Sequence, residues 1–424
     1  MAAWRNAARR RLVTGIAPRS ILRHLLDSAV ASAQPDRCVS SFLPDLPKGR
    51  TVVVGAGKAA AAMARAVENF FPAPVEGVVV TRYGAAVPCD AIQVLEAAHP
   101  IADEASIVAA KSMLAAVKGL TRDDLVLALI SGGGSALMSL PVEGVGLAEK
   151  QALVGQLMRA GAPIDLLNRM RRRLSQIKGG GLRQAIGAAR CVTLAISDVV
   201  GDDPALIASG PTIVPPADTG SLLDEMAPYR VAVSPLLHEL LASQPSGPST
   251  IPSRQDDEVH IVASPRTALE SAAGEARRLG LTPILLGDDI EGSPAEAARR
   301  HLAMWREAAL GSVLLSGGEL TCEVRGQGRG GPNHEFALEL MRAAAPDDAL
   351  WAIACDTDGC DGNSQVAGAI FGPDSICRAR NQGLDIRSFL ARNDSAAFFA
   401  ELGGPVETGP TQTNVNDFRA LLKV

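Results

Sequence analysis

The chain has 424 residues, of which 47% are hydrophobic and 21% charged, and its formal net charge is −5. Single hydrophobic cores usually stop growing at roughly 250 to 300 residues, so this length predicts two folded domains. The apolar content excludes a disordered chain, and the acidic balance excludes a broad basic surface for nucleic acid or an anionic membrane. An anionic ligand must therefore be bound by a few local cations.

Neither a membrane span nor a secretory leader is predicted. No apolar run approaches the roughly 20 residues that cross a bilayer, and no signal-peptide h-region follows Met1. The seven cysteines include no CxxC pair and have no histidine at zinc-finger spacing, so reduced thiols are expected. These features predict a cytoplasmic protein.

The first part of the chain repeats a βα pattern, in which a β-branched run leads into a Gly-rich or Asp-rich turn and then into a helix. Helices are predicted after the first strand, as far as Phe71, and at 103–118. The strands are predicted at 51–54, 75–80, 92–95, 125–130 and 192–196.

A stretch rich in Pro, Ser and Thr at 245–255 predicts a flexible connection. A second βα series is expected after it, with strands at 259–263, 283–286, 313–315, 322–325 and 350–354, and helices at 265–279, 294–309 and 333–344. The sequence thus predicts an α/β fold with two domains, residues 1–245 and 256–424. Each domain is expected to hold a mainly parallel sheet flanked by helices, the first of them Rossmann-like. Because open α/β sheets bind ligands at the carboxyl ends of their strands, the active site is expected in a cleft between the domains.

The first predicted strand ends in two glycines and a lysine, within the segment VVVGAGKAA. Gly55 and Gly57 fit a loose GxGxxA dinucleotide fingerprint, although an ordinary tight βα turn has the same composition. The spacing of a Walker A loop is absent. Lys58 lies beside a helix N-terminus, where the helix dipole disfavours a cation, so its presence indicates that an anion is bound there.

Three consecutive glycines follow the fourth predicted strand, within SGGGSALM. A glycine loop of this kind can direct its amides at a phosphate or a carboxylate, although a turn without function is the alternative. Ligand contacts are expected from Ser131, Gly132, Gly133, Gly134 and Ser135.

A basic segment, NRMRRRLSQIKGGG, occupies residues 168–181. Its cations cannot all share one helix face, so a solvated basic surface explains some of them. Arg171 and Lys178 are seven residues apart and therefore lie on one face if the helix continues, where they could bind an anion together.

Acidic residues cluster at predicted strand ends. Asp198 follows the fifth strand, Glu319 follows the strand at 313–315, and Asp356 and Asp358 lie in the segment CDTDGCDG. Carboxylates suit Mg²⁺, which phosphoryl transfer requires, but aspartate is also common in ordinary glycine-rich turns. The chain has no GxSxG elbow, which disfavours a hydrolase triad.

Several of these segments, taken in order, resemble the glycerate 2-kinase family, whose C-terminal part carries a MOFRL domain. They are VVGAGKAA, HPIADEAS, LISGGGSALM, the basic segment at 168–181, SDVVGDDPALIASGPT, LLSGGE, GRGGPNHE, CDTDGCDG and TGPTQTNVND. The resemblance runs from about Val52 to Asp417 and places the MOFRL region at about 310–418. It implies transfer of phosphate from ATP, with Mg²⁺, to the 2-hydroxyl of D-glycerate.

The resemblance also implies roles for particular residues. Lys58 matches the lysine of the family's GAGKA motif, and Arg171 matches the arginine of its NxVRxHLSxIKGG motif. We expect Lys58, Arg171 and Asp198 to be catalytic, with Arg171 pairing with the carboxylate of glycerate, and we expect Mg²⁺ to bind Asp198, Asp356 and Asp358. Contacts to substrate or ATP are expected from Gly55, Gly57, Ser131, Gly132, Gly133, Gly134, Ser135, Ser175, Lys178, Glu319, Arg329, Asn333, Asp356 and Asp358.

Two positions depart from the family pattern. Arg173 stands where the family often has histidine, and Pro332 stands where many members have arginine. If that arginine contacts the transferred phosphate, its task passes to Arg329 or Arg325, or the specificity has changed.

The alternative function is an NAD(P)H-dependent hydroxypyruvate reductase, because members of the same family have carried that label. The GxGxxA turn supports it, and Arg82 would meet a 2′-phosphate, whereas no histidine stands out as a proton donor. A ligand sensor without catalysis is a third class, but no output module is recognisable. Both enzymes would act on a small hydroxy acid or its keto form, and a homodimer is compatible with the sequence.

Overall fold

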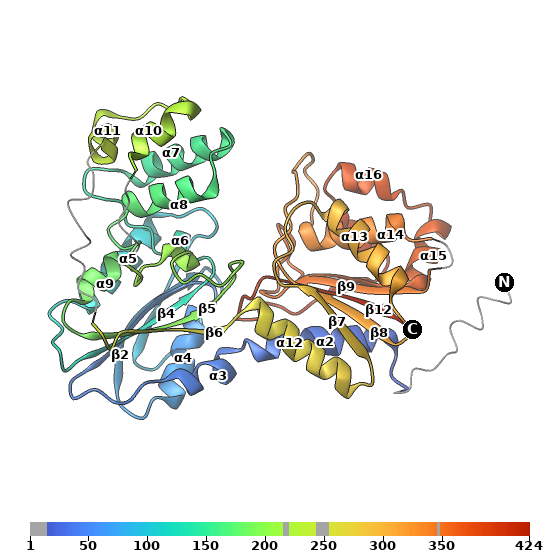
Figure 1. Cartoon of the computed structure of the whole chain (residues 1–424), viewed down its shortest axis with the longest axis horizontal. Helices are drawn as coiled ribbons and strands as arrows, with labels where there is room; N and C mark the ends of the chain where they lie inside the picture. Colours follow the sequence, from blue (N-terminus) through green and yellow to red (C-terminus); the bar gives the residue numbers. More distant parts are fainter. Residues whose placement is uncertain (1–14, 215–219, 243–253, 346–347) are drawn as a thin grey trace. The chain divides into compact units, whose positions relative to one another are not determined.

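The computed structural model describes residues 15–214, 220–242, 254–345 and 348–424 (Figure 1). The chain forms two compact units: Cys38–Val262, and the segment up to Arg37 together with Ala263–Val424. Residues 15–37 thus pack with the C-terminal part of the chain, whereas the prediction placed them in the first domain, residues 1–245. Most of the predicted connection at 245–255 lies outside the described residues.

The first unit is built on a six-stranded sheet with the order β3-β2-β1-β4-β5-β6. All four pairings among the first five strands are parallel. The sixth strand was predicted in the second domain, at 259–263, but it lies beside β5, where Asp257 and Glu258 bind the start of that strand. The strands are β1 (Thr51–Ala56), β2 (Val75–Arg82), β3 (Ile92–Ala97), β4 (Leu125–Ser131), β5 (Arg190–Ile196) and β6 (Glu258–Ala263).

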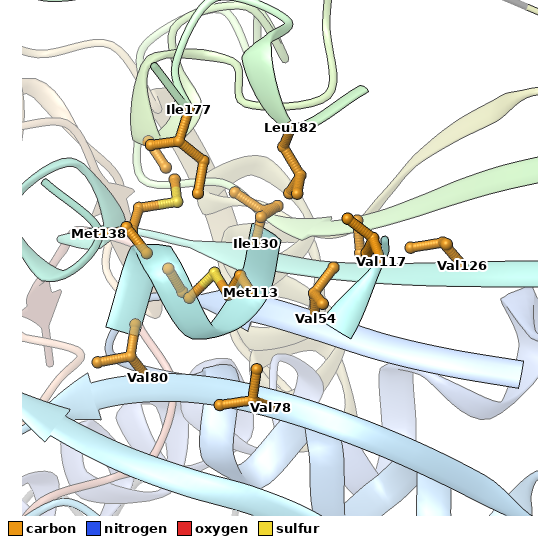
Figure 2. Packing of buried hydrophobic residues seen from close by; sticks show 14 of the residues in the cluster. Val54, Val78, Val80, Met113, Val117, Val126, Ile130, Met138, Ile177 and Leu182 are labelled. Atoms are coloured by element: carbon orange, nitrogen blue, oxygen red, sulfur yellow. The ribbon is translucent and has the colours of Figure 1, made fainter. Parts of the chain in front are cut away.

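Helices cover both faces of this sheet, α4 (Ala60–Phe70) on one and α5 (Glu104–Ala116) on the other (Figure 1). Every residue of β1 and β4 is buried, as expected for parallel strands covered on both faces. Asp103 caps α5 by accepting a hydrogen bond from the Ser106 amide. Figure 2 shows the core beneath α5, where Met113 and Val117 pack against strand residues such as Val54 and Ile130.

A group of helices above the sheet has a separate small core. It includes Leu153 and Leu157 of α7 (Leu147–Arg159) and Leu167 and Met170 of α8 (Ile164–Arg173). The remaining short helices of this unit are α3 (Pro35–Cys38, which begins before the boundary), η1 (Ser40–Phe42), α6 (Gly134–Leu137), α9 (Gly181–Ile186), η2 (Ile207–Ser209), α10 (Leu222–Met226), η3 (Ala227–Tyr229) and α11 (Pro235–Ala242).

The second unit holds a mixed six-stranded sheet with the order β11-β10-β9-β12-β8-β7. Only the β7–β8 pairing is parallel among the described pairings of this sheet, whereas a mainly parallel sheet was expected. The last strand of the chain, β12, inserts antiparallel between β8 and β9. The strands are β7 (Thr282–Gly287), β8 (Ser312–Ser316), β9 (Leu350–Asp356), β10 (Gly368–Phe371), β11 (Pro405–Val406) and β12 (Asp417–Lys423).

Helix α2 (Pro18–Ser32) lies beside α12 (Pro265–Arg278) on one face of this sheet, and α13 (Pro294–Glu307) and α14 (Pro332–Ala343) cover the other (Figure 1). Three further helices are α15 (Pro373–Asn381), α16 (Ile386–Ala391) and α17 (Ser395–Glu401). The strand predicted at 322–325 is absent, because these residues are mostly exposed and the Arg325 amide bonds to the Asn393 side chain instead of a strand.

The prediction of an α/β fold with two sheets flanked by helices is confirmed. None of the helices described here has the length and apolar character needed to cross a membrane.

Candidate active site

The first sheet changes winding direction between β1 and β4. The chain runs outward from β1 through β2 to β3 and then returns to place β4 on the other side of β1. In open α/β sheets, the carboxyl ends of the two central strands form a crevice at this point, where ligands bind. Gly57 and Lys58 follow β1 there, and the segment Ser131–Ser135 follows from the end of β4.

Hydrogen bonds join these two turns. The amide of Lys58 donates to the Gly132 carbonyl at 2.9 Å, and the amide of Ala59 donates to Ser131 Oγ at 3.0 Å. The amide of Gly57 donates to the Val80 carbonyl at 3.1 Å. The amides of residues 57–59, which lead into α4, are therefore bound to protein atoms, whereas a dinucleotide fingerprint leaves the amides of this turn for a pyrophosphate.

Most glycines of the two turns are required by close packing. A Cβ on Gly55 would overlap Leu129 of β4, and a Cβ on Gly57 would overlap the Ser131 side chain. A Cβ on Gly134 would lie 2.7 Å from that of Ala208. Direct contact of these three glycines with a phosphate stays a prediction.

Gly133 differs, because it has φ +80° and faces functional side chains. A Cβ on Gly133 would lie 3.0 Å from the His99 ring and 3.4 Å from Cγ of Lys58. The glycine loop thus brings the Lys58 side chain, which follows β1, next to a histidine that follows β3.

A cavity of about 490 Å³ opens beside this loop. It is lined by Gly133 and Ser135, by His99, and by three cationic side chains from two helices and the turn that follows them. The cations are Lys150, Arg171 and Lys178. None of the described residues that line the cavity carries a carboxylate.

The partners of these cations are neutral. Lys178 Nζ donates to the Ser135 carbonyl at 2.6 Å, and Arg171 Nη1 donates to Asn168 Oδ1 at 3.1 Å. Lys150 Nζ has no hydrogen-bond acceptor among the described residues, although the residue is only 4% exposed.

The electrostatics of the cavity follow from this crowding. Burial, with Arg171 nearby, lowers the pKa of Lys150 to about 8. Burial and the two neighbouring cations lower the pKa of Lys178 well below its ordinary value, and burial also lowers the pKa of Arg171. Three cations held together without a protein anion favour the binding of an anionic ligand.

The helical group and the sheet core position these cations. Lys150 and Arg171 project from α7 and α8, which share the core of the helical group. Ile177, next to Lys178, is fully buried in the sheet core near Met138, which follows the glycine loop (Figure 2). Both sides of the cavity are therefore anchored by apolar packing.

The predicted meeting of Arg171 and Lys178 is found, but not on one continuous helix. Helix α8 ends at Arg173, and the chain then turns at Ser175. The Ser175 hydroxyl donates to the Leu140 carbonyl and accepts from the Lys178 amide, so Ser175 shapes the turn that presents Lys178. A ligand contact by Ser175 itself stays a prediction.

Asp198 follows β5 at the same edge of the sheet. Ile196, the last residue of β5, is paired with Ser131 in the parallel register, and Asp198 comes two residues later. Its carboxylate thus belongs to the strand end next to the glycine loop. Arg82 is the last residue of β2. This strand is the neighbour of β1 on the side away from β4 and β5.

A second polar cluster, in the other unit, gathers at the edge where β8 and β9 end and β12 begins. Asn333 Nδ2 donates to Asp417 Oδ1 at 2.6 Å and to Asp361 Oδ1 at 3.2 Å, while His334 Nδ1 lies 2.5 Å from Asp361 Oδ2. Asp417 is also paired with Arg419. Asn333 is 1% exposed, so in this structure the side chain holds α14 to the strand ends.

The predicted metal ligands Asp356 and Asp358 lie at this edge, directly after β9. Asp356 Oδ1 accepts a hydrogen bond from the Asp358 amide at 2.9 Å, and Asp358 Oδ1 accepts from the Cys360 amide at 2.8 Å. No group of three or more metal-ligating side chains occurs among the described residues. Metal binding by Asp198, Asp356 and Asp358 stays a prediction.

Glu319 and Arg329 are exposed residues of the same unit. Glu319 follows β8, next to Gly318, which has φ +97° and packs against the backbone of Ile290. The Arg329 amide donates to Asp394 Oδ1 at 3.0 Å, so the backbone of the glycine loop is fixed while the guanidinium faces solvent.

Comparison with known proteins identifies the family. A domain of unknown function, DUF4147, matches residues 21–242, and the MOFRL family matches residues 312–417. The glycerate 2-kinase of Pyrococcus horikoshii is 37% identical over 87% of this chain and 86% of its own length. The chain belongs to the glycerate 2-kinase family.

Other members of the glycerate 2-kinase family extend the comparison. The crystal structure of the Thermotoga maritima glycerate kinase aligns with a TM-score of 0.86 at 32% identity, covering 96% of this chain and 99% of that one. A protein of Agrobacterium vitis is 46% identical over 96% of this chain and 95% of its own length, and its name is "Putative hydroxypyruvate reductase". The predicted family is confirmed, and both labels that it has carried occur among the relatives.

The two departures from the glycerate 2-kinase pattern have structural explanations. Arg173 donates from Nε and Nη2 to the Leu240 carbonyl, at 3.2 and 3.1 Å, and so ties α8 to α11. Pro332 is the first residue of α14, where its missing amide and fixed φ suit a helix start.

Two residues of the candidate site were not predicted. Lys150 was missed because one lysine on an amphipathic helix is usually solvated, and nothing in the local sequence shows that this one is buried. His99 was missed because no histidine stood out in the sequence as a proton donor. The segment HPIADEAS, which contains His99, was noted only as part of the family resemblance.

Proposed function

We propose that this chain transfers the γ-phosphoryl group of ATP to the 2-hydroxyl of D-glycerate, as the names of its glycerate 2-kinase relatives suggest. The observation that carries the proposal is the position of Lys58 against the glycine loop, at the point where the sheet changes winding direction. Phosphoryl transfer needs positioning and neutralisation of charge more than covalent chemistry. A lysine at this edge supplies a positive charge where the transferred group would lie.

The residues of the first unit have distinct proposed tasks. Lys58 neutralises charge that develops on the phosphoryl oxygens, and Arg171 binds the carboxylate of glycerate at the cationic cavity. The loop Ser131–Ser135 adjoins Lys58 and contributes Gly133 and Ser135 to the cavity lining, so it would hold the hydroxyl of the acid near the phosphoryl group. Contacts of Glu319, Arg329 and Asn333 with nucleotide or acid belong to the proposal as further predictions.

Mg²⁺ would bind carboxylates of this chain together with phosphate oxygens. Asp356 and Asp358 lie close together directly after β9, and carboxylate oxygens suit a hard cation that keeps several water ligands. When bound, Mg²⁺ offsets the negative charge of the phosphates. Asp198 is the candidate ligand in the first unit.

The Lys58→Ala variant tests the proposal. We expect ADP release with D-glycerate to fall by about 100-fold or more while the melting temperature changes little, because Lys58 is outside the hydrophobic core. Near-normal turnover in this variant would remove Lys58 from the mechanism.

Hydroxypyruvate reduction is the second candidate, because the Agrobacterium vitis relative carries that name and His99 lies beside the glycine loop as a proton donor would. The amides of Lys58 and Ala59 argue against it, since they are bound to Gly132 and Ser131. Measuring ADP release with glycerate beside NADH and NADPH oxidation with hydroxypyruvate separates the two reactions. A ligand sensor would give neither signal.

The cellular setting belongs to the same proposal. All seven cysteines are free thiols, which suits a reducing compartment and supports a cytoplasmic location. A homodimer belongs to the proposal as well, and the mass of the protein in solution tests it.

A further inference from the structure

We propose that Lys150, together with Arg171 and Lys178, forms the subsite that binds the carboxylate of the hydroxy acid, and that Lys150 gains its anionic partner only when the acid binds. This inference rests on the proposed function, because glycerate is the acid in question. It adds to the proposed function a binding residue on α7.

The first argument is the unmet bonding capacity of Lys150. Its ammonium group has three donors and, among the described residues, no acceptor, although the residue is only 4% exposed. A buried cation without a partner is costly, and folded proteins usually pair it. The cavity that Lys150 lines is therefore the place where an acceptor is missing.

The second argument is the chemistry of the surrounding residues. Arg171 donates to the side-chain amide of Asn168, and Lys178 donates to the backbone carbonyl of Ser135. Both acceptors are neutral, so neither offsets the positive charge. Apolar side chains such as Val154 and Met158 line another part of the cavity. A small acid could place its carboxylate among the three cations without competing with a carboxylate of the protein.

The third argument concerns pH. The charged or titratable groups facing Lys150 are Arg171 on α8, Lys178 after α8, and His99 from the segment after β3. Because the pKa of Lys150 is lowered to about 8, the lysine loses its charge in the empty site at mildly alkaline pH. Binding of a carboxylate above this pH would require Lys150 to take up a proton, so the affinity for the acid falls as the pH rises.

The test compares Lys150→Met with Lys111→Met, in which an exposed lysine of α5 is changed in the same way. In Lys150→Met we expect the KM for D-glycerate to rise more than about tenfold, while the KM for ATP stays constant. The melting temperature without substrate should increase, because an unpaired buried charge is removed. Lys111→Met should match the wild type in all three quantities.

The pH profile gives an independent readout. The KM of the wild type for D-glycerate should rise above pH 8, and this rise should be missing in Lys150→Met. An unchanged KM for D-glycerate in Lys150→Met would overturn the proposal. A lower melting temperature with both KM values disturbed would also overturn it, since that pattern indicates a structural lysine.

Failure of the proposed function gives a different result. If the wild type releases no ADP with D-glycerate, that function is rejected, and the subsite is then tested by thermal shift with D-glycerate, hydroxypyruvate and inorganic phosphate. Stabilisation of the wild type by either organic acid, and not of Lys150→Met, would support a carboxylate subsite. Stabilisation by phosphate alone would overturn the carboxylate assignment, and no stabilisation would overturn the subsite.

Discussion

At the scale of single residues, the candidate site depends on where charged side chains are placed relative to solvent. Lys150 and Arg171 come from neighbouring helices, Lys178 from the turn that follows, and Lys58 from the end of a strand, yet all lie around one glycine loop. Local sequence identifies Lys58, Arg171 and Lys178 because they lie in glycine-rich or strongly basic segments. It does not identify Lys150, because burial of a helix residue depends on which other helix covers it.

The lowered pKa of Lys150 predicts how stability depends on pH. In the unfolded chain this pKa returns to about 10.5, so the folded protein carries the full cost of the buried charge below pH 8. Between pH 8 and 10.5 the unfolded chain binds more protons than the folded one, so the contribution of this residue to stability rises with pH. At about 1.4 kcal/mol per pKa unit, Lys150→Met should be more stable at pH 7 by up to about 3 kcal/mol.

Urea unfolding of the wild type and Lys150→Met without substrate measures this difference. The difference in unfolding free energy between the two proteins should decrease from pH 8 to pH 10. A difference that stays constant over this pH range would show that the folded protein does not bury the charged form of Lys150.

Gly133 gives a second prediction at this scale. Gly133→Ala should lower kcat/KM for D-glycerate by at least about tenfold, because the new methyl group would press on the His99 ring at 3.0 Å and fill the space beside the Lys58 side chain. Gly84→Ala is the matched control, since Gly84 has φ +75° and nothing within 4 Å of the added Cβ. Both variants should lose about 1 kcal/mol of unfolding free energy through backbone strain, but only Gly133→Ala should lose activity.

At the scale of elements, strands followed by glycine turns were the easiest features to predict. The ranges expected for β1, β4 and β5 agree with the structure within a few residues, because continuous β-branched runs lead there into sharp turns. The partners of the strands were harder to predict. Residues 259–263 were assigned to the second domain by their place in the sequence, but Asp257 and Glu258 bind them to the edge of β5.

The role of Arg173, where the family often has histidine, is tested through the contact between α8 and α11. Arg173→His should lower the unfolding free energy by about 1 kcal/mol, because two hydrogen bonds to the Leu240 carbonyl are lost. The KM for D-glycerate and the turnover should stay within a factor of about two, since Arg173 does not line the cavity. A large change in either kinetic constant would show that position 173 acts on the substrate.

At the scale of the whole molecule, helix α2, from the early part of the chain, packs in the same unit as the C-terminal part. Helix α2 buries Ile21, Leu22, Leu25 and Leu26, and Ser28 bonds to Ser271 of α12. A domain boundary drawn from composition could not reveal this, because the amphipathic pattern of α2 shows that a face is buried but not which surface covers it. The mixed strand pairing of the second sheet was also missed, because local sequence does not show which strands become neighbours. Strand β12 lies between β8 and β9 although it is the last strand of the chain.

The placement of α2 predicts where a core substitution acts. Leu25→Ala should cost about 2 to 5 kcal/mol, because it removes a fully buried side chain. In hydrogen exchange, the amides of β8, β9 and β12 should exchange faster than in the wild type, while those of β1 and β4 keep their rates. Faster exchange confined to β1 and β4 would contradict the assignment of α2 to the second unit.

The proposal that the chain phosphorylates D-glycerate at its 2-hydroxyl is tested most directly by the product. With ATP, Mg²⁺ and D-glycerate, the proton-coupled phosphorus NMR spectrum should show a new phosphate ester resonance split into a doublet by the single proton on C2. A triplet would place the phosphate on C3. Oxidation of NADH or NADPH by hydroxypyruvate with no new phosphorus resonance would contradict the kinase assignment altogether.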